Sequence, residues 1–453
     1  MKYKWNDDAR EKVISGWKDL KYGMFVHFGL FSLCGGMWNG KPVTYGYSEQ
    51  ILSHGPIPHI DYERLASQLT IEKFNADEIA SLAKDAGMNY IVMMTKHHDG
   101  FCLFDTDTTD YNSVHSACHK DVIAEMSEAC RKAGLKFGLY YSWIDWHYPY
   151  ALPISSHNSD AIPPLHMQYN LDQLTELLSN YGPICELWMD MGAPTKDQSE
   201  SVRELAHRLQ PGIMINGRIW NDCGDFVTMA DNGYPDCSLD VPWQTPATVY
   251  HETWGYRSWQ KRDDMPGKVK AISENLFRVL DGGGNYLLNI GPEGDGSVVP
   301  FERDVLLEIR KKIDERGGLD RHCPCEIASE SIDGNEAVVL ENGTPHFRYT
   351  GSEYYSLRKI ITAYSWNLDL KHDGDYRLSY LLDEPLKHEQ KLCIDTPDET
   401  FIFPMKENKQ EFGICSSVHL GKGLNTISLY TPGPSISRPE FPGIVVRLKL
   451  ERL

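Results

Sequence analysis

ICELWMDMG, residues 184–192, is an apolar stretch that ends at a carboxylate. Gly182-Pro183 precedes it and Gly192 closes it, so its first seven residues have the length and the boundaries of a buried strand. In barrels and open α/β sheets the chemistry takes place at the carboxyl ends of parallel strands, which is where Asp190 stands. Because Asp also caps turns well, this stretch alone supports both a catalytic Asp190 and a turn-capping one.

A helical segment followed by a short apolar run recurs through the N-terminal part of the chain. Such runs are predicted as strands at residues 22–32, 89–95, 136–143, 184–190, 213–218 and 284–291. The irregular segment 222–256 has room for two more. Because helices that alternate with strands give parallel strands and right-handed crossovers, we predict an α/β fold, a (β/α)8-like barrel.

The sequence pattern changes after Gly317-Gly318. From residue 323 to residue 453, short apolar or alternating runs are separated by Gly, Pro, Asp and Asn, as in a β-sandwich. A chain of 453 residues is long enough for a large barrel and one accessory domain. We therefore predict a catalytic barrel at residues 1–318 and a C-terminal β-sandwich domain at residues 319–453.

The composition restricts the partners of the chain. Acidic residues outnumber basic residues, 64 to 45, giving a formal charge of −19, which disfavours nucleic acids and anionic membranes and suits a neutral ligand. The N-terminus lacks the apolar core of a signal peptide, and no later run has the length of a membrane span. We therefore expect a cytoplasmic protein, or an exported one whose signal has been removed. The 11 cysteines are scattered, which argues against a disulfide framework.

Polar side chains stand at or near the ends of the predicted strands, and a barrel would bring them into one pocket. A lone His on a buried strand is more often a hydrogen-bonded core residue, but His27, like Asp190, lies near the end of its strand. Neutral imidazoles, a Tyr and an Arg with few carboxylates suit a polyhydroxylated neutral ligand. The strand-end residues are His27, His97, His98, Asp99, Tyr141, Trp143, Asp190, Asn216, Arg218 and Asn289.

Several motifs follow one another between residues 21 and 317 in the order of a known family. They are GMFVHFG (23–29), TKHHDGF (95–101), GLYYS (138–142), ELWMD (186–190), NGR (216–218), WGY (254–256) and GGNYLLNIGP (283–292). Each motif alone is weak, but together they are highly specific. On these motifs the chain resembles the retaining α-L-fucosidases of glycoside hydrolase family 29.

The resemblance implies that Asp190 is the nucleophile of a retaining hydrolase and forms a fucosyl-enzyme intermediate. Arg218 would lie beside this carboxylate and favour its ionised form, and Trp254 would cover the apolar face of the sugar. The family's Trp after the sugar-binding Glu is Gln50 here, so one stacking contact is missing or supplied elsewhere, for example by Trp38. The other implied substrate-binding residues are His27, Glu49, His97, His98 and Tyr141.

The general acid/base of the family is replaced in this chain. The family often has Trp-Glu-Thr shortly before Trp-Gly-Tyr, whereas this chain has WQT at residues 243–245, and an amide cannot donate the proton. Three explanations stay open. Gln244 is an engineered replacement at the acid/base position; another acid, Asp231 or Glu252, does the work; or the chain is a fucose-glycan-binding protein without turnover.

The resemblance also implies the substrate class, a fucosylated oligosaccharide or glycoconjugate, and no cofactor. Residues 51–62 and the Trp-X-Thr form at 243–245 resemble the branch that prefers α-1,3/1,4-linked fucose. A rival class, a metal-dependent hydrolase, would use His97, His98 and Asp99. Because adjacent residues on a strand point to opposite faces, the two imidazoles would not easily share an ion, and we expect no metal site.

Overall fold

The computed structural model describes residues 7–151, 159–235, 239, 241–320, 330–332, 337–341, 344–350, 358–382, 391–396, 400–404, 413–430 and 445–453. The chain divides into two compact units. One unit comprises Met1–Pro235, Pro242–Arg321 and Gly351–Leu357, and the other comprises Asp236–Val241, His322–Thr350 and Arg358–Leu453. The predicted domain boundary near residue 318 lies close to the division between Arg321 and His322.

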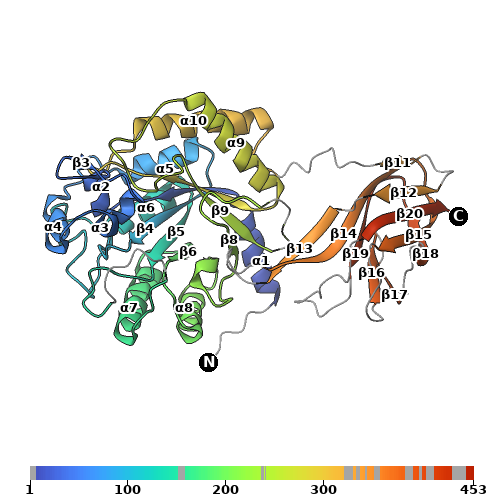
Figure 1. The fold of residues 1–453 in the computed structure, drawn as a ribbon, viewed down its shortest axis with the longest axis horizontal. Helices are drawn as coiled ribbons and strands as arrows, with labels where there is room; N and C mark the ends of the chain where they lie inside the picture. Colours follow the sequence, from blue (N-terminus) through green and yellow to red (C-terminus); the bar gives the residue numbers. More distant parts are fainter. Residues whose placement is uncertain are drawn as a thin grey trace. The chain divides into compact units, whose positions relative to one another are not determined.

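An eight-stranded sheet in the order β7-β6-β5-β4-β1-β10-β9-β8 forms the centre of the first unit. All neighbouring strands are paired in parallel, and the sheet curls as a barrel does (Figure 1). The predicted barrel-type fold is confirmed. The strands are β1 (Tyr22–Val26), β4 (Tyr90–Lys96), β5 (Lys136–Ser142), β6 (Ile184–Asp190), β7 (Met214–Ile215), β8 (Val227–Thr228), β9 (Trp243–Thr248) and β10 (Asn285–Ile290).

Long helices lie around the sheet (Figure 1). Their ends follow from local sequence: the Asn75 side chain accepts a hydrogen bond from the backbone N of Glu78 before α5, and Gly134 ends α6 in the left-handed conformation. The helices are α1 (Asp7–Lys18), α5 (Ala76–Asp85), α6 (Val122–Ala133), α7 (Pro164–Asn180), α8 (Lys196–Leu209), α9 (Met265–Asp281) and α10 (Pro300–Arg316).

The segment between β1 and α5 forms several short elements that carry Glu49 to the barrel mouth. Its 3-10 helix η1 begins at Ser48, whose hydroxyl is bonded to Thr253 at 2.7 Å. The elements are α2 (Leu30–Cys34), β2 (Met37–Trp38), β3 (Lys41–Pro42), η1 (Ser48–Gln50), α3 (Ile51–His54), α4 (His59–Glu63) and η2 (Arg64–Gln68).

The barrel sheet has an unpaired seam between β7 and β8, within the part of the chain that the structure describes. The 3-10 helix η3 (Gly217–Ile219) stands between them in the sequence, where an ideal barrel has an α-helix. The backbone N of Asp225 bridges the seam by donating to the carbonyl of Ile215 at 2.7 Å, and the carboxylate of Asp225 is bonded to His207 at 2.8 Å. This short connection places Arg218 at the carboxyl ends of the strands.

The second unit is built from two mainly antiparallel sheets, as a β-sandwich is. One sheet has the order β11-β14-β19-β16-β17 with β13 beside β14, and the other has the order β12-β20-β15-β18. Apolar residues of both sheets form one core, with Leu368 of β14 and Leu378 of β15 fully buried. The strands are β11 (Glu330–Ile332), β12 (Val338–Glu341), β13 (Thr344–Thr350), β14 (Arg358–Leu370), β15 (Gly374–Leu382), β16 (Lys391–Asp395), β17 (Thr400–Pro404), β18 (Gly413–Leu420), β19 (Gly423–Tyr430) and β20 (Val445–Arg452).

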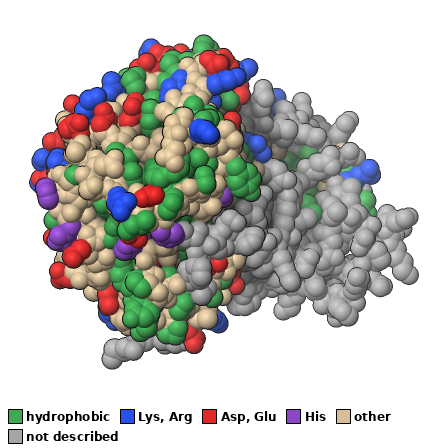
Figure 2. All heavy atoms as spheres, turned by 60° about the vertical axis from the view of Figure 1, so that its left-hand side comes forward, with side chains coloured by type: hydrophobic (Ala, Val, Ile, Leu, Met, Phe, Trp, Pro, Cys, Tyr) green, Lys and Arg blue, Asp and Glu red, His purple; other side chains and the backbone are tan. Residues whose placement is uncertain are grey.

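The surface of the first unit carries acidic and basic side chains interspersed with one another on the face that Figure 2 shows. Among the described residues, we find no helix with the length and apolar character that crossing a membrane requires.

Candidate active site

A pocket of about 110 Å³ lies at the carboxyl ends of the barrel strands. Asp190, the last residue of β6, lines it, as does His97, which directly follows β4. Its wall therefore combines strand ends with the long loop after β1. The lining residues are Phe25, His27, Tyr47, Glu49, Gln50, His97, His98, Tyr140, Trp188, Asp190, Met191, Arg218, Trp220, Asp231 and Trp254.

The carboxylate of Asp190 is held by two donors. Arg218 Nη1 donates to Oδ1 at 2.7 Å, and the hydroxyl of Tyr140 donates to Oδ2 at 2.8 Å. Burial alone would raise the pKa of Asp190, but the charge of Arg218 and these hydrogen bonds outweigh it and hold the pKa below its usual value. Asp190 is therefore ionised, positioned and partly open to the pocket, with 13% of its side chain exposed.

A second carboxylate, Asp231, shares the same guanidinium. Arg218 Nη2 donates to its Oδ1, so Arg218 bridges Asp190 and Asp231. Asp231 reaches the barrel mouth because Asn232 next to it is tied to the end of β9: Asn232 Oδ1 accepts from the backbone N of Thr248 at 2.9 Å. With 31% of its side chain exposed, Asp231 is the more solvent-accessible acid of the two.

Three imidazoles, His27, His97 and His98, line the same pocket. Burial lowers the pKa of His27 and the pKa of His98 to about 4, and it lowers the pKa of His97 well below its usual value. All three rings are therefore neutral at neutral pH. His98 Nε2 lies 3.9 Å from Oδ2 of Asp190, so at least one ring faces the position where chemistry on a ligand would occur.

Glu49 and Trp254 also line the pocket. Glu49 Oε2 accepts hydrogen bonds from the backbone N of Gly255 at 2.9 Å and of Trp254 at 3.2 Å. Burial raises the pKa of Glu49 to about 7, although these backbone donors act against the shift. The Trp254 ring lies 5.2 Å from the ring of His27 and offers an apolar face to the pocket.

Tyr141, predicted to bind the ligand, lies outside the pocket, and Tyr140 lines it instead. The Tyr141 hydroxyl is bonded to Asn170 Oδ1 at 2.9 Å and to Gln173 Oε1 at 2.8 Å, both on α7. Consecutive strand residues point to opposite faces of a sheet, so only one of the two tyrosines of β5 can face the barrel interior. In this structure Tyr140 takes the pocket-facing position that was predicted for Tyr141.

Gln244, at the predicted acid/base position, does not reach the pocket. It is fully buried near the amino ends of the strands, where its Nε2 donates to Glu186 Oε1 at 2.9 Å and to the hydroxyl of Tyr90 at 3.0 Å. Trp188 lines the pocket, and its Nε1 donates to Gln244 Oε1 at 2.9 Å, so the amide lies one layer below the pocket. The motif lies at the start of β9, whereas the pocket lies at the other end of the strand.

Glu252, the other alternative acid, is exposed and does not line the pocket, so of the three predicted positions the structure brings only Asp231 there. Gln50 lines the pocket at the position expected for a Trp, and Trp38 does not line it.

His97 and His98 lie side by side, with ring centroids 3.8 Å apart, and both line the pocket. The expectation that they point to opposite faces is wrong because β4 ends at Lys96, before either residue. Asp99 does not line the pocket and accepts a hydrogen bond from the hydroxyl of Tyr62 at 2.7 Å. Among the described residues, no group of three or more His, Cys, Asp or Glu side chains is arranged to hold a metal ion.

The remaining strand-end residues support the pocket from behind. Asn216 fixes β6 through two bonds to the backbone of Met189, at 2.8 and 2.9 Å. Trp143 Nε1 donates to the carbonyl of Arg218 at 3.1 Å, and Asn289 is bonded to His27 at 2.7 Å.

Trp220 is a pocket residue that sequence reasoning missed. It follows η3 with the left-handed φ of 68°, which non-glycine residues rarely adopt, and its Nε1 donates to the carbonyl of Met191 at 3.0 Å. Nothing in the periodicity of the sequence marks such a position.

The barrel mouth holds an ionised carboxylate, a second acid, neutral imidazoles and an aromatic wall. These are the parts of a glycoside hydrolase active site. Residues 1–317 match the model of the family described as Alpha-L-fucosidase. The chain belongs to this family, glycoside hydrolase family 29, whose members are retaining enzymes.

Characterised relatives and solved structures are similar to this chain. Tissue alpha-L-fucosidase of Mus musculus is 27% identical over 74% of this chain and 76% of its own length. The structure of alpha-L-fucosidase AlfC from Lactobacillus casei in complex with alpha-L-fucose product is 33% identical, with a TM-score of 0.61, over 68% of this chain and 99% of that one. The alpha-L-fucosidase from Vibrio sp. strain EJY3, 21% identical with a TM-score of 0.61, covers 97% of this chain and 98% of its own, and supports the fold alone.

Proposed function

We propose that this chain removes terminal α-L-fucose from glycans by double displacement, with Asp190 as nucleophile. The observation that carries the proposal is the Asp190 carboxylate, which Arg218 and Tyr140 orient and keep ionised inside a pocket of neutral imidazoles. Asp190 attacks the anomeric carbon as the bond to the leaving oxygen breaks, and a fucosyl-enzyme ester forms. Water then attacks the same carbon, and the ester bond to Asp190 breaks.

We assign the general acid/base to Asp231. It gives its proton to the leaving oxygen in the first step and takes one from the attacking water in the second. Two features support this choice over Asp190: Asp231 has the more exposed side chain, and among the described residues its side-chain donor is Arg218, whereas Asp190 has both Arg218 and Tyr140. The shared guanidinium of Arg218 keeps both acids at the pocket wall while the proton moves.

The proposed sugar contacts are hydroxyls against His27, His97 and His98, and the apolar face of the ring against Trp254. Glu49 adds a carboxyl group, and all five residues line the pocket. Neutral acceptors and one aromatic wall fit a deoxysugar that has both hydroxyls and a methyl group.

The linkage is a finer proposal with two candidates. Residues 51–62 resemble the branch that acts on α-1,3/1,4-linked fucose. A variant of AlfC has been solved in complex with Fuca(1,6)GlcNAc, with 33% identity over 68% of this chain, which favours an α-1,6 linkage. Hydrolysis rates on fucose joined 1,3, 1,4 and 1,6 to the same GlcNAc separate the two candidates.

A glycan-binding protein without turnover was the rival that Gln244 suggested, but Gln244 lies below the pocket and gives it no support. The decisive assay uses an aryl α-L-fucoside with a good leaving group and a natural disaccharide with a poor one. We expect Asp190→Ala to lose both activities and Asp231→Ala to lose mainly the disaccharide activity, because a good leaving group needs little protonation.

Each alternative predicts a different result in this assay. Absence of turnover in the unmodified chain, with fucose still bound, would establish the binding protein. Loss of activity with EDTA would support the metal-dependent hydrolase built on His97, His98 and Asp99. Equal losses on both substrates for Asp231→Ala would remove Asp231 from the acid role.

A further inference from the structure

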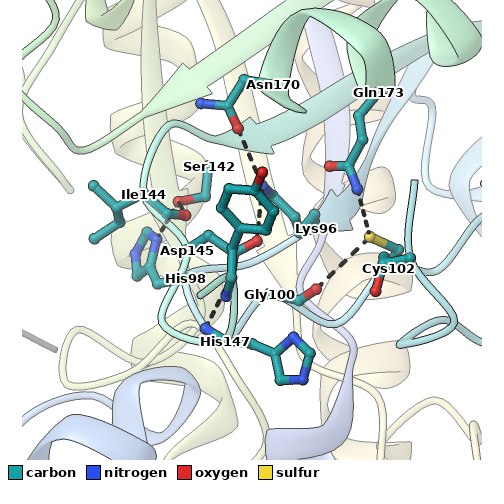
Figure 3. Close-up of polar contacts among 12 residues, drawn as sticks. Lys96, His98, Gly100, Cys102, Ser142, Ile144, Asp145, His147, Asn170 and Gln173 are labelled. Atoms are coloured by element: carbon teal, nitrogen blue, oxygen red, sulfur yellow. Dashed lines mark hydrogen bonds and ion pairs between the residues drawn. The ribbon is translucent and has the colours of Figure 1, made fainter. Parts of the chain in front are cut away.

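A chain of hydrogen bonds behind His98 fixes the position of its proton (Figure 3). The Ser142 hydroxyl donates to the carbonyl of Ile144 at 2.8 Å, and a carbonyl can only accept. Ser142 Oγ has a single hydrogen, so toward His98 Nδ1, at 2.7 Å, it must accept. In the neutral ring the proton is therefore on Nδ1, and Nε2 presents a lone pair to the pocket.

An unrelated set of residues gives His27 the same arrangement. Asn289 Nδ2 donates to the carbonyl of Trp254 at 2.7 Å, which fixes the orientation of the amide. Asn289 Oδ1 lies 2.7 Å from His27 Nδ1 and can only accept, so Nδ1 carries the proton here too. Two imidazoles, in the segments that follow β1 and β4, thus present Nε2 as an acceptor.

We propose that Ser142 and Asn289 are positioning residues that lock His98 and His27 as acceptors, so that the pocket selects sugars with two hydroxyl donors. This inference rests on the proposed function, because it names fucose hydroxyls as the donors. It extends that function by assigning the direction of two hydrogen bonds. Sugars whose hydroxyls at these two positions are methylated or replaced by fluorine have no proton to donate and are rejected.

A buried ion pair holds the turn whose Ile144 carbonyl accepts from Ser142, and this bond fixes the position of the His98 proton. Lys96 Nζ lies 3.3 Å from Asp145 Oδ2, and both side chains are buried. Asp145 Oδ1 accepts from the backbone N of His147 and of Tyr148, each at 2.8 Å. The turn that contains Ile144 is therefore anchored to the strand that leads to His98 (Figure 3).

Two backbone features near this ion pair further restrict the turn. The backbone N of Trp146 donates to the carbonyl of His98 at 2.7 Å. Gly100 has a left-handed φ of 78°, and a Cβ atom there would overlap the Asp145 carboxylate. The Ile144 carbonyl is thus kept in place to accept from Ser142.

Neutron diffraction of the ligand-free protein at neutral pD tests the lock without any sugar. We expect deuterium on Nδ1 of His27 and of His98 and none on Nε2. Deuterium on Nε2 of His98 would overturn the proposal even if the chain proves to be an active fucosidase. Conversely, if the protein does not bind fucose, the proposed function is wrong, but the deuterium positions on the two histidines can still be as expected.

Binding of L-fucose, and of its deoxy and deoxyfluoro analogues at C2, C3 and C4, tests the direction of the bonds. Free sugars are used because no glycosidic bond is then broken. At two of the three positions we expect both analogues to bind about tenfold more weakly than fucose, because a buried acceptor loses its donor in each. Deoxyfluoro sugars that bind nearly as well as fucose at every position would contradict the lock, since fluorine accepts but does not donate.

Ser142→Ala tests the role of the hydroxyl, and Ser113→Ala is the matched control. Ser113 is equally buried and donates to the carbonyl of Lys120 at 2.6 Å, but it bonds to no histidine. Without Ser142 Oγ the His98 proton is free to move to Nε2, so the preference for hydroxyl over fluorine should fall about tenfold at one position only. An unchanged preference would overturn the role of Ser142, and Ser113→Ala should keep the full preference.

Discussion

The Tyr140 hydroxyl donates to Oδ2 of Asp190 at 2.8 Å, across the two neighbouring strands β5 and β6. Together with Arg218 on Oδ1, it gives both oxygens of this carboxylate a donor. The next residue, Tyr141, faces the opposite way, and its hydroxyl is hydrogen-bonded to Asn170 and Gln173 of α7. The two adjacent tyrosines therefore form a natural pair of test and control.

Tyr140→Phe should lower kcat on an aryl fucoside by about 10- to 100-fold, because a hydrogen bond to a charged group contributes about 1.5 to 3 kcal/mol. Removing the donor leaves Asp190 less well oriented for attack. Tyr141→Phe should lower the melting temperature while leaving kcat within about twofold, since its hydroxyl bonds only within the fold. The reverse result would mean that Tyr141 is the ligand-binding tyrosine, as the sequence predicted.

Gln244→Glu should fail to increase activity, because Gln244 lies below the pocket. Its amide donates to Glu186, so a carboxylate there would replace a donor with a second acid. Burial raises the pKa of Glu186 to about 7. The variant should therefore lose most stability above that pH, where both acids are ionised. We expect the free energy of unfolding to fall by about 2 kcal/mol.

The double variant Gln244→Glu with Glu186→Gln is the control, because it exchanges the acid and the amide. It should recover much of the lost stability in thermal unfolding. A rise in kcat/KM for Gln244→Glu of more than about tenfold would instead identify Gln244 as the replaced acid/base. A restored general acid would give a rate increase of at least that size.

The pH profile of kcat/KM should fall on the acid side as pH drops through about 4. His27 and His98 have a pKa of about 4, so both rings are neutral and accepting above this pH and become protonated donors below it. Arg218 and Tyr140 hold the pKa of Asp190 below its usual value, which moves protonation of the nucleophile toward lower pH. Because kcat/KM reports the free enzyme and Glu49 itself titrates at about 7, an acid limb centred near 6.5 that persists in Glu49→Gln would show that the imidazoles titrate normally. Circular dichroism over the same range controls for unfolding.

Lys96→Met should destabilise the barrel by about 3 to 5 kcal/mol, because it leaves the charge of Asp145 buried without its partner. Adding Asp145→Asn should restore part of the loss, since Asn still accepts from the turn backbone but is neutral. Urea unfolding, monitored by the loss of activity, measures the stability of the single and the double variant. Arg131→Met, which breaks the exposed pair with Glu128, should have little effect. Additive losses in the double variant would contradict coupling between Lys96 and Asp145.

The sequence was sufficient for the barrel and placed several residues at its mouth, because strand ends are marked locally. Asp190, His27 and Arg218 each end or follow an apolar run, and barrel topology brings such ends together. The tyrosines of β5 were harder, because both satisfy the strand pattern and only the register with the neighbouring strands decides which one faces inward.

The acid/base position shows the limit of motif matching. The triplet at residues 243–245 lies in β9 at the buried end of the barrel, and its letters do not reveal how far along the strand it stands. Asp231 is in an irregular segment, where no periodicity exists, and reaches the pocket through the bond between Asn232 and Thr248. Trp220 depends on an unusual backbone conformation, which the sequence does not encode in a recognisable pattern.

Gly100, which follows the paired histidines in the TKHHDGF run, leaves no room for a methyl group beside Asp145. The smallest substitution there would displace the turn behind Ser142 and so disturb where the proton of His98 resides. Because a φ of 78° also disfavours any side chain, even alanine there should lower stability as well as alter which sugars the pocket admits.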